Sequence, residues 1–175
     1  VGKVTLTLSR LSYSYPDDLD ILLVSPTGRV VLALSDAGGG NGVTDLTLTL
    51  DDFAPGAAPD SGRLLPGSYR PTDYEPGDVL PAPAPAGPFA SAFSAFEGID
   101  PNGTWSLYIA DDFFQDQGIL QGGWSLDITT VGIIDPQPAL LRAGRLLTGG
   151  GFEFQLKGIV GGKYEIQSST DFRNR

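Results

Sequence analysis

Apolar and polar residues alternate along several short stretches of this chain, with the period of a β-strand. Val4–Leu8 and Leu46–Leu50 place an apolar side chain at every second position, so each predicts a strand with one buried face. Leu19–Val24 is apolar at all but one position, which favours a central strand. A turn with Pro and Gly follows at Ser25–Gly28, and Val30–Leu34 returns as the partner strand. These two strands therefore predict a hairpin.

Two tryptophan-bearing stretches of nearly the same spelling follow a long irregular segment. Residues 55–88 are rich in Pro, Gly, Ala and Asp, which predicts an excursion across the surface. The phenylalanines between positions 89 and 96 are spaced by four and three residues, which fits a helical turn or an irregular strand. Trp105-Ser-Leu and Trp124-Ser-Leu each begin an alternating run. Both predict strands with inward tryptophans, so core packing is favoured over a sugar-stacking platform.

The pattern predicts three parts in the chain. Residues 1–131 hold most of the short strands and glycine, proline and aspartate turns, which favours an all-β jelly-roll sandwich of about eight strands. Residues 132–144 contain two prolines and predict a linker. Residues 145–175 follow, where Phe152–Leu156 and Tyr164–Ile166 alternate across a glycine turn. This last part predicts a short, incomplete β-hairpin module.

Composition and charge narrow the classes of function. Of the 175 residues, 41% are hydrophobic and 18% are charged, which is typical of a folded domain with a real core. The net charge of −10 repels phosphate backbones and anionic lipid surfaces, so we expect no nucleic-acid partner. No stretch has the roughly 18 to 20 apolar residues that span a bilayer, so no membrane insertion is expected. The absence of methionine suggests a piece of a longer protein.

The chain has no histidine and no cysteine. This excludes Ser-His-Asp and Cys-His catalysis in their usual form, and it excludes metals bound through imidazole or thiolate. Any metal must be a hard cation held by oxygen, with Ca²⁺ first. Pairs of carboxylates arise by chance among 21 acidic residues, so they carry no signal for a glycosidase. We therefore expect no catalytic residues.

Acidic loops are the main candidates for a site. A hairpin brings its open ends together, so Asp18 and Asp20 should lie near Asp36, and the loop that follows the first tryptophan strand can reach the same rim. The candidate ligands are Asp18, Asp20, Asp36, Asp111, Asp112 and Asp116. Carboxylates and loop carbonyls are the ligands of Ca²⁺, but the spacing does not match an EF-hand. Aspartate is also a common turn residue, so a structural Ca²⁺ and plain turn chemistry both stay open.

Aromatic residues near turns are a second class of candidate. Tyr13 and Tyr15 share one face of the chain beside a turn, and Phe113 and Phe114 lie at a loop tip. Each pair either folds back on the core of its own domain or contacts a neighbouring domain or a carbohydrate.

Ordered motifs in the first 130 residues resemble a known family. They are Asp18-Leu19 with Ser25-Pro26-x-Gly28, and Gly103-x-Trp105-x-Leu107 with Asp111, Gly118 and Trp124-x-Leu126. This order resembles the P domain, or homo-B domain, of subtilisin-like proprotein convertases and of exported bacterial proteins. The family usually carries a histidine before the Asp-Leu strand, where this chain has Tyr13-Ser-Tyr15-Pro. Residues 152–171 resemble a short β repeat near the C-termini of exported bacterial proteins.

The resemblance implies an eight-stranded jelly roll without catalytic residues of its own. It implies a secreted or cell-surface bacterial protein in which this module packs beside neighbouring domains, among them a subtilisin-like serine protease domain, and stabilises them. The alternative is a carbohydrate-binding jelly roll that anchors its parent protein to polysaccharide or to the cell surface.

Overall fold

The computed structural model describes residues 1–113, 116–130, 140–146 and 152–157. The chain divides into two compact units, Val1–Val131 and Gly132–Arg175. Within the described ranges, no helix is long and apolar enough to cross a membrane.

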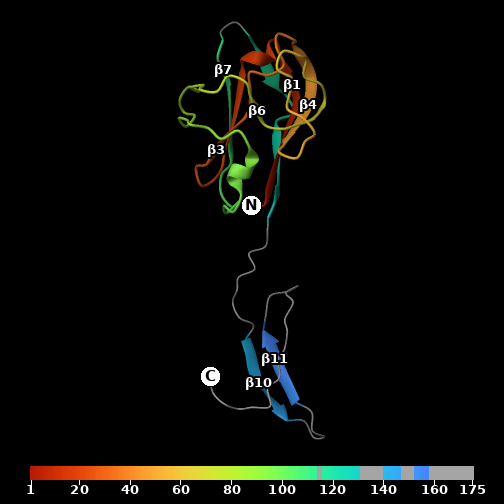
Figure 1. Cartoon of the computed structure of the whole chain (residues 1–175), viewed down its shortest axis with the longest axis vertical. Helices are drawn as coiled ribbons and strands as arrows, with labels where there is room; N and C mark the ends of the chain where they lie inside the picture. Colours follow the sequence, from red (N-terminus) through yellow and green to blue (C-terminus); the bar gives the residue numbers. More distant parts are fainter. Residues whose placement is uncertain (114–115, 131–139, 147–151, 158–175) are drawn as a thin grey trace. The chain divides into compact units, whose positions relative to one another are not determined.

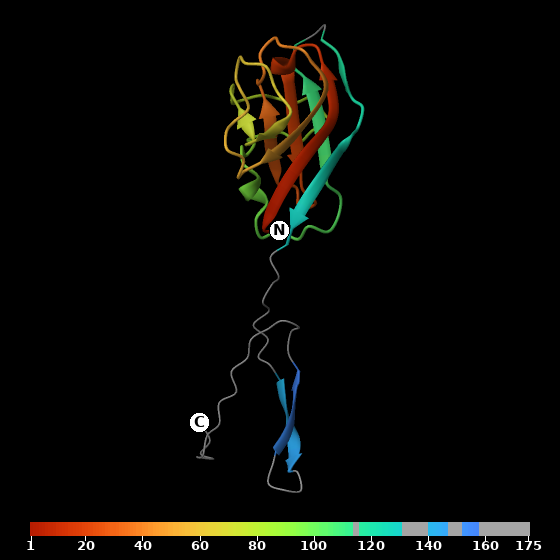
Figure 2. The ribbon, with the colours of Figure 1, turned by 90° about the vertical axis from the view of Figure 1, so that its right-hand side faces the viewer.

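The first unit is a sandwich of two sheets (Figures 1 and 2), which confirms the all-β prediction. One sheet has the order β5-β4-β1, with both β8 and β9 paired to β1. Its strands are β1 (Lys3–Tyr13), β4 (Val43–Asp51), β5 (Gly67–Tyr69), β8 (Gly118–Leu120) and β9 (Trp124–Thr129). The second sheet has the order β6-β3-β2-β7. Its strands are β2 (Leu19–Val24), β3 (Val30–Ser35), β6 (Thr72–Asp73) and β7 (Ser106–Asp111).

The described part of this unit has nine strands, and the chain crosses between the sheets four times, after β1, β3, β5 and β7. The predicted β2–β3 hairpin is confirmed, with Leu23 opposite Val31. Strand β2 is buried on both faces because a second layer covers the outside of its sheet. In that layer Leu80, from the irregular segment, packs on Leu22 and Leu32. The excursion predicted for residues 55–88 therefore covers a sheet in part.

Strand β1 changes its edge partner along its length. Its first half, Lys3–Leu8, pairs with β9, and Leu11–Tyr13 pairs with β8; Figure 2 shows β1 in red beside β9 in cyan. Between the two halves Arg10 has a φ of 57° and the register to β4 shifts, as in a β-bulge. The bulge directs Tyr13 inward, where it is 8% exposed. Of the two alternatives left open for these tyrosines, Tyr13 thus folds back on the core of its own domain, whereas Tyr15 is exposed.

Two phenylalanines close the end of the core beside the N-terminus (Figure 1). The segment Phe93–Phe96 forms a single 3₁₀ turn, η2, which settles the open choice between turn and strand. The two rings stack with centroids 6.1 Å apart. The Phe96 ring meets the edge of Trp105 at 5.1 Å, and Trp105 Nε1 donates a hydrogen bond to the Pro101 carbonyl at 3.0 Å. Core packing of Trp105 is therefore confirmed.

Trp124 differs from this expectation. It lies opposite the buried Leu8 at the start of β9, so its side chain leaves the sheet on the same face as Leu8. The ring is nevertheless 39% exposed, because β9 pairs only with β1 in the described residues and lies at the edge of the sheet. The prediction of a buried Trp124 is wrong, although Leu126 and Ile128 further along the strand do pack on the core.

Gly122, in the turn between β8 and β9, lies very close to the backbone of β1. This close approach requires a glycine there, and it allows a test of how β8 and β9 pair with β1. A Cβ at Gly122 would lie 2.8 Å from the Ser9 carbonyl oxygen, whereas a Cβ at Gly56 would meet nothing within 4 Å. We expect Gly122→Ala to lower the free energy of unfolding by roughly 1–3 kcal/mol in chemical denaturation. Gly56→Ala should leave it nearly unchanged. Equal values for the two variants would contradict the close contact of this turn with β1.

In the second unit the backbone is described for one strand pair. Strand β10 (Leu140–Leu146) is antiparallel to β11 (Phe152–Lys157), with Leu141 opposite Leu156. The predicted strand at Phe152–Leu156 is confirmed, but its partner is upstream, within and just after the segment predicted as a linker. The other predicted strand, Tyr164–Ile166, lies outside the described residues.

Candidate metal centre

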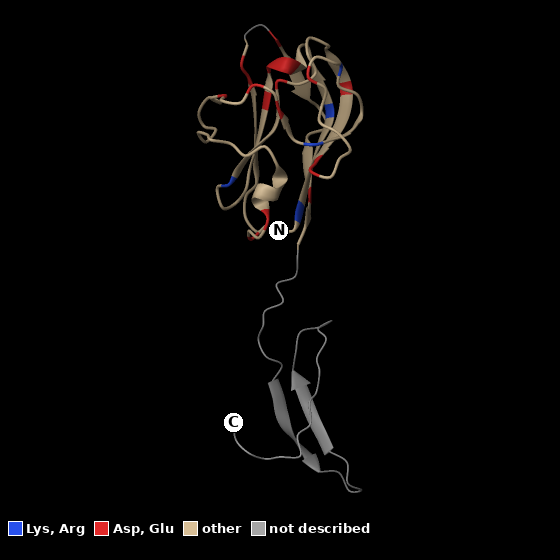
Figure 3. Ribbon diagram, viewed as in Figure 1, with Lys and Arg blue, Asp and Glu red and all other residues tan. Residues whose placement is uncertain are grey.

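The direction of the strands collects aspartates at one end of the sandwich. Strand β2 begins there, whereas β3, β6 and β7 end there, as the pairs Leu19–Asp111 and Ser35–Asp73 show. Short connections at the same end add further carboxylates. Figure 3 shows this acidic rim on the end that carries η1 (Pro16–Asp18), away from the N-terminus. Its aspartates are Asp17, Asp18, Asp20, Asp36, Asp73, Asp78, Asp111, Asp112 and Asp116.

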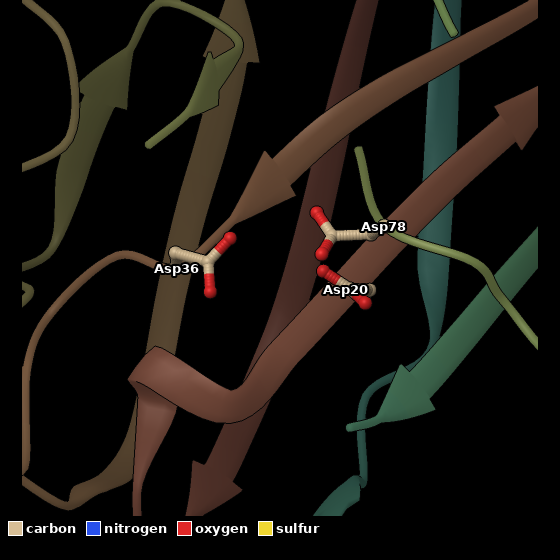
Figure 4. A group of neighbouring side chains, drawn as sticks. All are labelled: Asp20, Asp36 and Asp78. Carbon is tan, nitrogen blue, oxygen red and sulfur yellow. The ribbon is translucent and has the colours of Figure 1, made fainter. Parts of the chain in front are cut away.

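Three of these residues form a tight group, the three-Asp cluster of Asp20, Asp36 and Asp78. One carboxylate oxygen from each lies within 4.8 Å of the others, and Figure 4 shows the three side chains turned toward one another. Asp20 lies on β2, Asp36 follows the last residue of β3, and Asp78 comes from the irregular segment after β6. Three segments that are distant in sequence therefore supply the cluster.

The Ser35 hydroxyl lies at the centre of the cluster. Its Oγ is 2.7 Å from Asp20 Oδ1, 2.8 Å from Asp36 Oδ2 and 3.2 Å from Asp78 Oδ2. A serine hydroxyl has one proton to donate, so it satisfies one of these carboxylates at a time. The cluster thus has more acceptors than this donor can serve.

Local structure holds each carboxylate in place. Asp36 has a φ of 51°, a left-handed conformation that aspartate tolerates better than most residues, and this turns the chain at the end of β3. Asp78 is two residues before Leu80, whose side chain is buried in the outer layer over β2 and β3. Asp20 is only 3% exposed because it lies within a central strand.

Burial and crowding disfavour the charged form of these groups. Burial is the main cause that raises the pKa of Asp20 to about 6. The hydrogen bond from Ser35 opposes this effect, and the charges of Asp78, Asp36 and Asp112 add to it. Burial also raises the pKa of Asp36, and the negative charges of nearby acidic side chains, Asp78 first, add to this effect. Burial and the charge of Asp78 also raise the pKa of Asp73. A carboxylate whose charge is opposed in this way is stabilised by a cation.

No basic side chain of the described residues forms an ion pair with the rim. The two ion pairs in these ranges are Lys3–Asp51 at 2.8 Å and Arg10–Asp45 at 2.7 Å, and neither includes a rim residue. In addition, Oδ1 of Asp73 is buried without a hydrogen-bond partner there. The rim therefore carries negative charge and an orphaned oxygen that a bound cation would balance.

The six predicted ligands fall into two groups. Asp20 and Asp36 lie in the three-Asp cluster, as the hairpin argument expected. The other four lie beside it: the charges of Asp112, Asp116 and Asp111 contribute to raising the pKa of Asp18 to about 6, after the effect of burial. The third member of the cluster, Asp78, was not predicted, because it lies in a segment without periodicity.

Of the two aromatic candidates in the loop after β7, the structure describes one. Phe113 is exposed, and its backbone N–H donates to Asp111 Oδ1 at 3.0 Å. Phe114 lies outside the described residues. For Phe113 the structure thus favours an outward side chain.

The site contains oxygen ligands for a hard cation and no histidine or cysteine base or nucleophile, since the sequence has neither residue. Comparison with protein-family models, with curated proteins and with solved structures gives no match.

In metal-free buffer we expect the stability of the sandwich to fall as the pH rises from about 4 to about 7. The pKa values of Asp20 and Asp18 in the folded protein are about 6, above the ordinary 3.8. The folded state therefore binds more protons than the unfolded state across this window, and loses that advantage as the pH rises. Unfolding temperatures after EDTA treatment measure the effect.

Asp20→Asn should make the unfolding temperature depend less on pH. An unchanged dependence in that variant would contradict the burial of this charge. Asp127→Asn, on the surface of β9, is the control.

Proposed function

We propose that this chain is a non-catalytic β-sandwich accessory module, similar to the P domain of subtilisin-like proprotein convertases, and that a structural calcium ion at the three-Asp cluster stabilises it. The observation that carries the calcium proposal is the convergence of three carboxylates within 4.8 Å around a single hydroxyl donor. Three carboxylates offer up to six oxygens, and the Ser35 hydroxyl adds one, which suits the roughly six to eight oxygen ligands of Ca²⁺.

The ligand type favours Ca²⁺ over other common metals. Zn²⁺ and copper prefer imidazole and thiolate ligands, which this chain lacks. Mg²⁺ demands near-ideal octahedral geometry and keeps several waters. A cluster formed by a strand, a turn and a loop can adapt its carboxylates to the larger and more flexible coordination shell of Ca²⁺.

The accessory role is supported by the order of motifs in the sequence and by the β-sandwich that carries them. In this role the module docks on a neighbouring domain, and docking stabilises the folded state of that domain by mass action. A subtilisin-like serine protease of an exported bacterial protein is the partner that the P-domain resemblance favours. A cation bound by the aspartates of the rim then stabilises the module, and the stabilised module in turn stabilises the partner domain.

The test uses the longer protein that this role requires, produced with and without residues 1–131. We expect the unfolding temperature of the neighbouring domain to fall when the module is absent. A variant with Asp36→Asn and Asp78→Asn should show an intermediate value in the presence of Ca²⁺. An unfolding temperature of the neighbouring domain that does not depend on the module would contradict the accessory role.

A shallow, open depression in the surface favours the second candidate function, carbohydrate binding. It has a volume of about 380 Å³ and lies at the ends of β1, β4 and β8, with Ser12, Ser14, Thr44, Gln117 and Ile119 among its lining residues. Hydroxyl and amide side chains of this kind hydrogen-bond sugars. Retention of the chain on insoluble polysaccharide, lost in Gln117→Ala, would support this function over the accessory role; no retention would contradict it.

A further inference from the structure

We propose that the free edge of β7 binds an extended, basic segment of a partner protein, which joins the second sheet as an additional strand. Strand β7 ends the β6-β3-β2-β7 sheet, and β2 is its only neighbour among the described residues. An edge strand presents a row of backbone N–H and C=O groups with which a further strand can pair. This inference goes beyond the accessory role and does not depend on the calcium site.

The edge strands differ in length between the two sides of the sandwich. On one side the sheets end in β5 and β6, which have three and two residues. On the other side they end in β7 and β9, which have six residues each. Folded proteins commonly protect an edge by keeping it short or by placing Lys, Pro or another charged residue within the strand. The side with β7 and β9 is therefore the one where a partner strand has room to pair.

The composition of β7 distinguishes it from β9. Strand β7 reads Ser-Leu-Tyr-Ile-Ala-Asp, so its one charge lies at its last residue, Asp111. Strand β9 carries Asp127 within the strand, and an interior charge is one of the features that protect an edge. Between the two long edges, β7 is thus the one that lacks this protection.

An apolar side chain of β7 is left uncovered. Ile109 lies opposite Ile21, so both side chains leave the sheet on the same face, and Ile21 belongs to the core between the sheets. Ile109 is nevertheless 43% exposed, whereas Ile21 is fully buried. A strand added beside β7 would place a side chain next to Ile109 and bury it, which would add a hydrophobic contribution to the backbone hydrogen bonds.

The charge around this edge favours a basic partner. The five basic residues of the first unit all precede residue 71, and residues 98–130, which contain β7, β8 and β9, hold five aspartates and no Lys or Arg. Figure 3 shows β7 with acidic residues at its end, where Asp112 follows Asp111, and without a basic residue along it. Lys or Arg side chains of an added strand would complement this charge. A second copy of the chain would instead bring aspartates against aspartates.

The test uses the full chain and a synthetic peptide of about ten residues in which lysine and valine alternate. Calorimetric titration at low ionic strength should show binding that weakens as salt is added, and amide hydrogen exchange of β7 should slow in the complex. The same peptide with N-methyl groups on consecutive central residues cannot donate backbone hydrogen bonds to either side. We expect it to bind at least about tenfold more weakly, and a peptide with glutamate in place of lysine should not bind.

Ile109→Lys tests the location of the site. It places a positive charge within the β7 edge, where that charge repels the lysine peptide, and the affinity should fall at least about tenfold. Because Ile109 is partly exposed, the unfolding temperature should stay close to that of the parent protein, which shows that the variant is folded. Ile119→Lys makes the same change on β8, at a side chain that is 60% exposed, and should bind the peptide nearly as the parent does.

Three results would overturn the proposal. Equal affinity for the methylated and unmethylated peptides would mean adsorption on the acidic surface without strand pairing. An equal loss of affinity in Ile109→Lys and Ile119→Lys would place the peptide elsewhere. A chain that binds no lysine peptide, or that sediments as a dimer which Ile109→Lys dissociates, would rule out a basic partner at this edge.

Discussion

Calcium added to the metal-free protein is expected to raise the unfolding temperature of the β-sandwich by several degrees. A ligand that binds only the folded state adds about 2.7 kcal/mol when its free concentration is roughly 100 times its dissociation constant. For a unit of this size such a change shifts the unfolding temperature by roughly 5–15 °C. The physical reason is the three-Asp cluster, where burial and repulsion oppose the charge of Asp20 and a cation reverses that penalty.

The control for this experiment is a double variant that replaces two of the ligands by asparagine, which has nearly the same side-chain volume as aspartate. Asp36→Asn with Asp78→Asn should remove most of the rise in unfolding temperature that Ca²⁺ causes. The same double variant should be more stable than the parent protein in EDTA at neutral pH, because it carries less repulsion. The assignment would be contradicted if Ca²⁺ left the unfolding temperature of the parent protein unchanged. It would also be contradicted if Ca²⁺ raised the unfolding temperature of the double variant as much as that of the parent.

Phe96→Ala is expected to lower the free energy of unfolding by about 3–5 kcal/mol. Phe96 is fully buried, stacks on Phe93 and meets the edge of Trp105. Its removal leaves a cavity at the end of the core that η2 closes. Urea denaturation followed by tryptophan fluorescence measures the change, since Trp105 contacts the altered site.

Phe53→Ala is the matched control for the same chemical change. Phe53 is 78% exposed, and its ring lies 5.2 Å from Lys3 Nζ. A cation–π contact at an exposed position contributes about 0.5–1 kcal/mol, so the loss should not exceed that value. If the two variants lost the same stability, η2 would not be part of the core.

Periodicity alone was sufficient for the main strands and for part of the site. Alternation located β1, β4 and β9, and a run apolar on both faces located β2 as a strand with two covered sides. The hairpin argument brought Asp20 and Asp36 to one end of the sheet, where the structure has them. These predictions succeed because burial of one face requires the side chains of a strand to alternate.

The remaining features depend on contacts between distant segments. Asp78 joins the cluster because β6, a strand of only two residues, pairs in parallel with β3 and because Leu80 is buried over that sheet. Neither has a periodic signal. Tyr13 lies inward only because the strand bulges at Arg10, and the partial exposure of Trp124 follows from the position of β9 at a sheet edge. Such features are properties of the assembled sandwich.

The location of Asp78 links the candidate site to the covering layer. The segment that provides this carboxylate also covers the outer face of β2 and β3. A cation at the three-Asp cluster would therefore fasten that layer to the sheet, in addition to balancing charge. This gives the proposed ion a structural role without any catalytic chemistry.

The most direct test of a calcium ion at the three-Asp cluster is a crystal structure of the protein grown with CaCl₂. We predict anomalous density for one ion bound by Asp20, Asp36 and Asp78, with carboxylate oxygens at about 2.3–2.6 Å. At saturating Ca²⁺, a cluster that contains only water, with its carboxylates turned apart, would contradict the proposal.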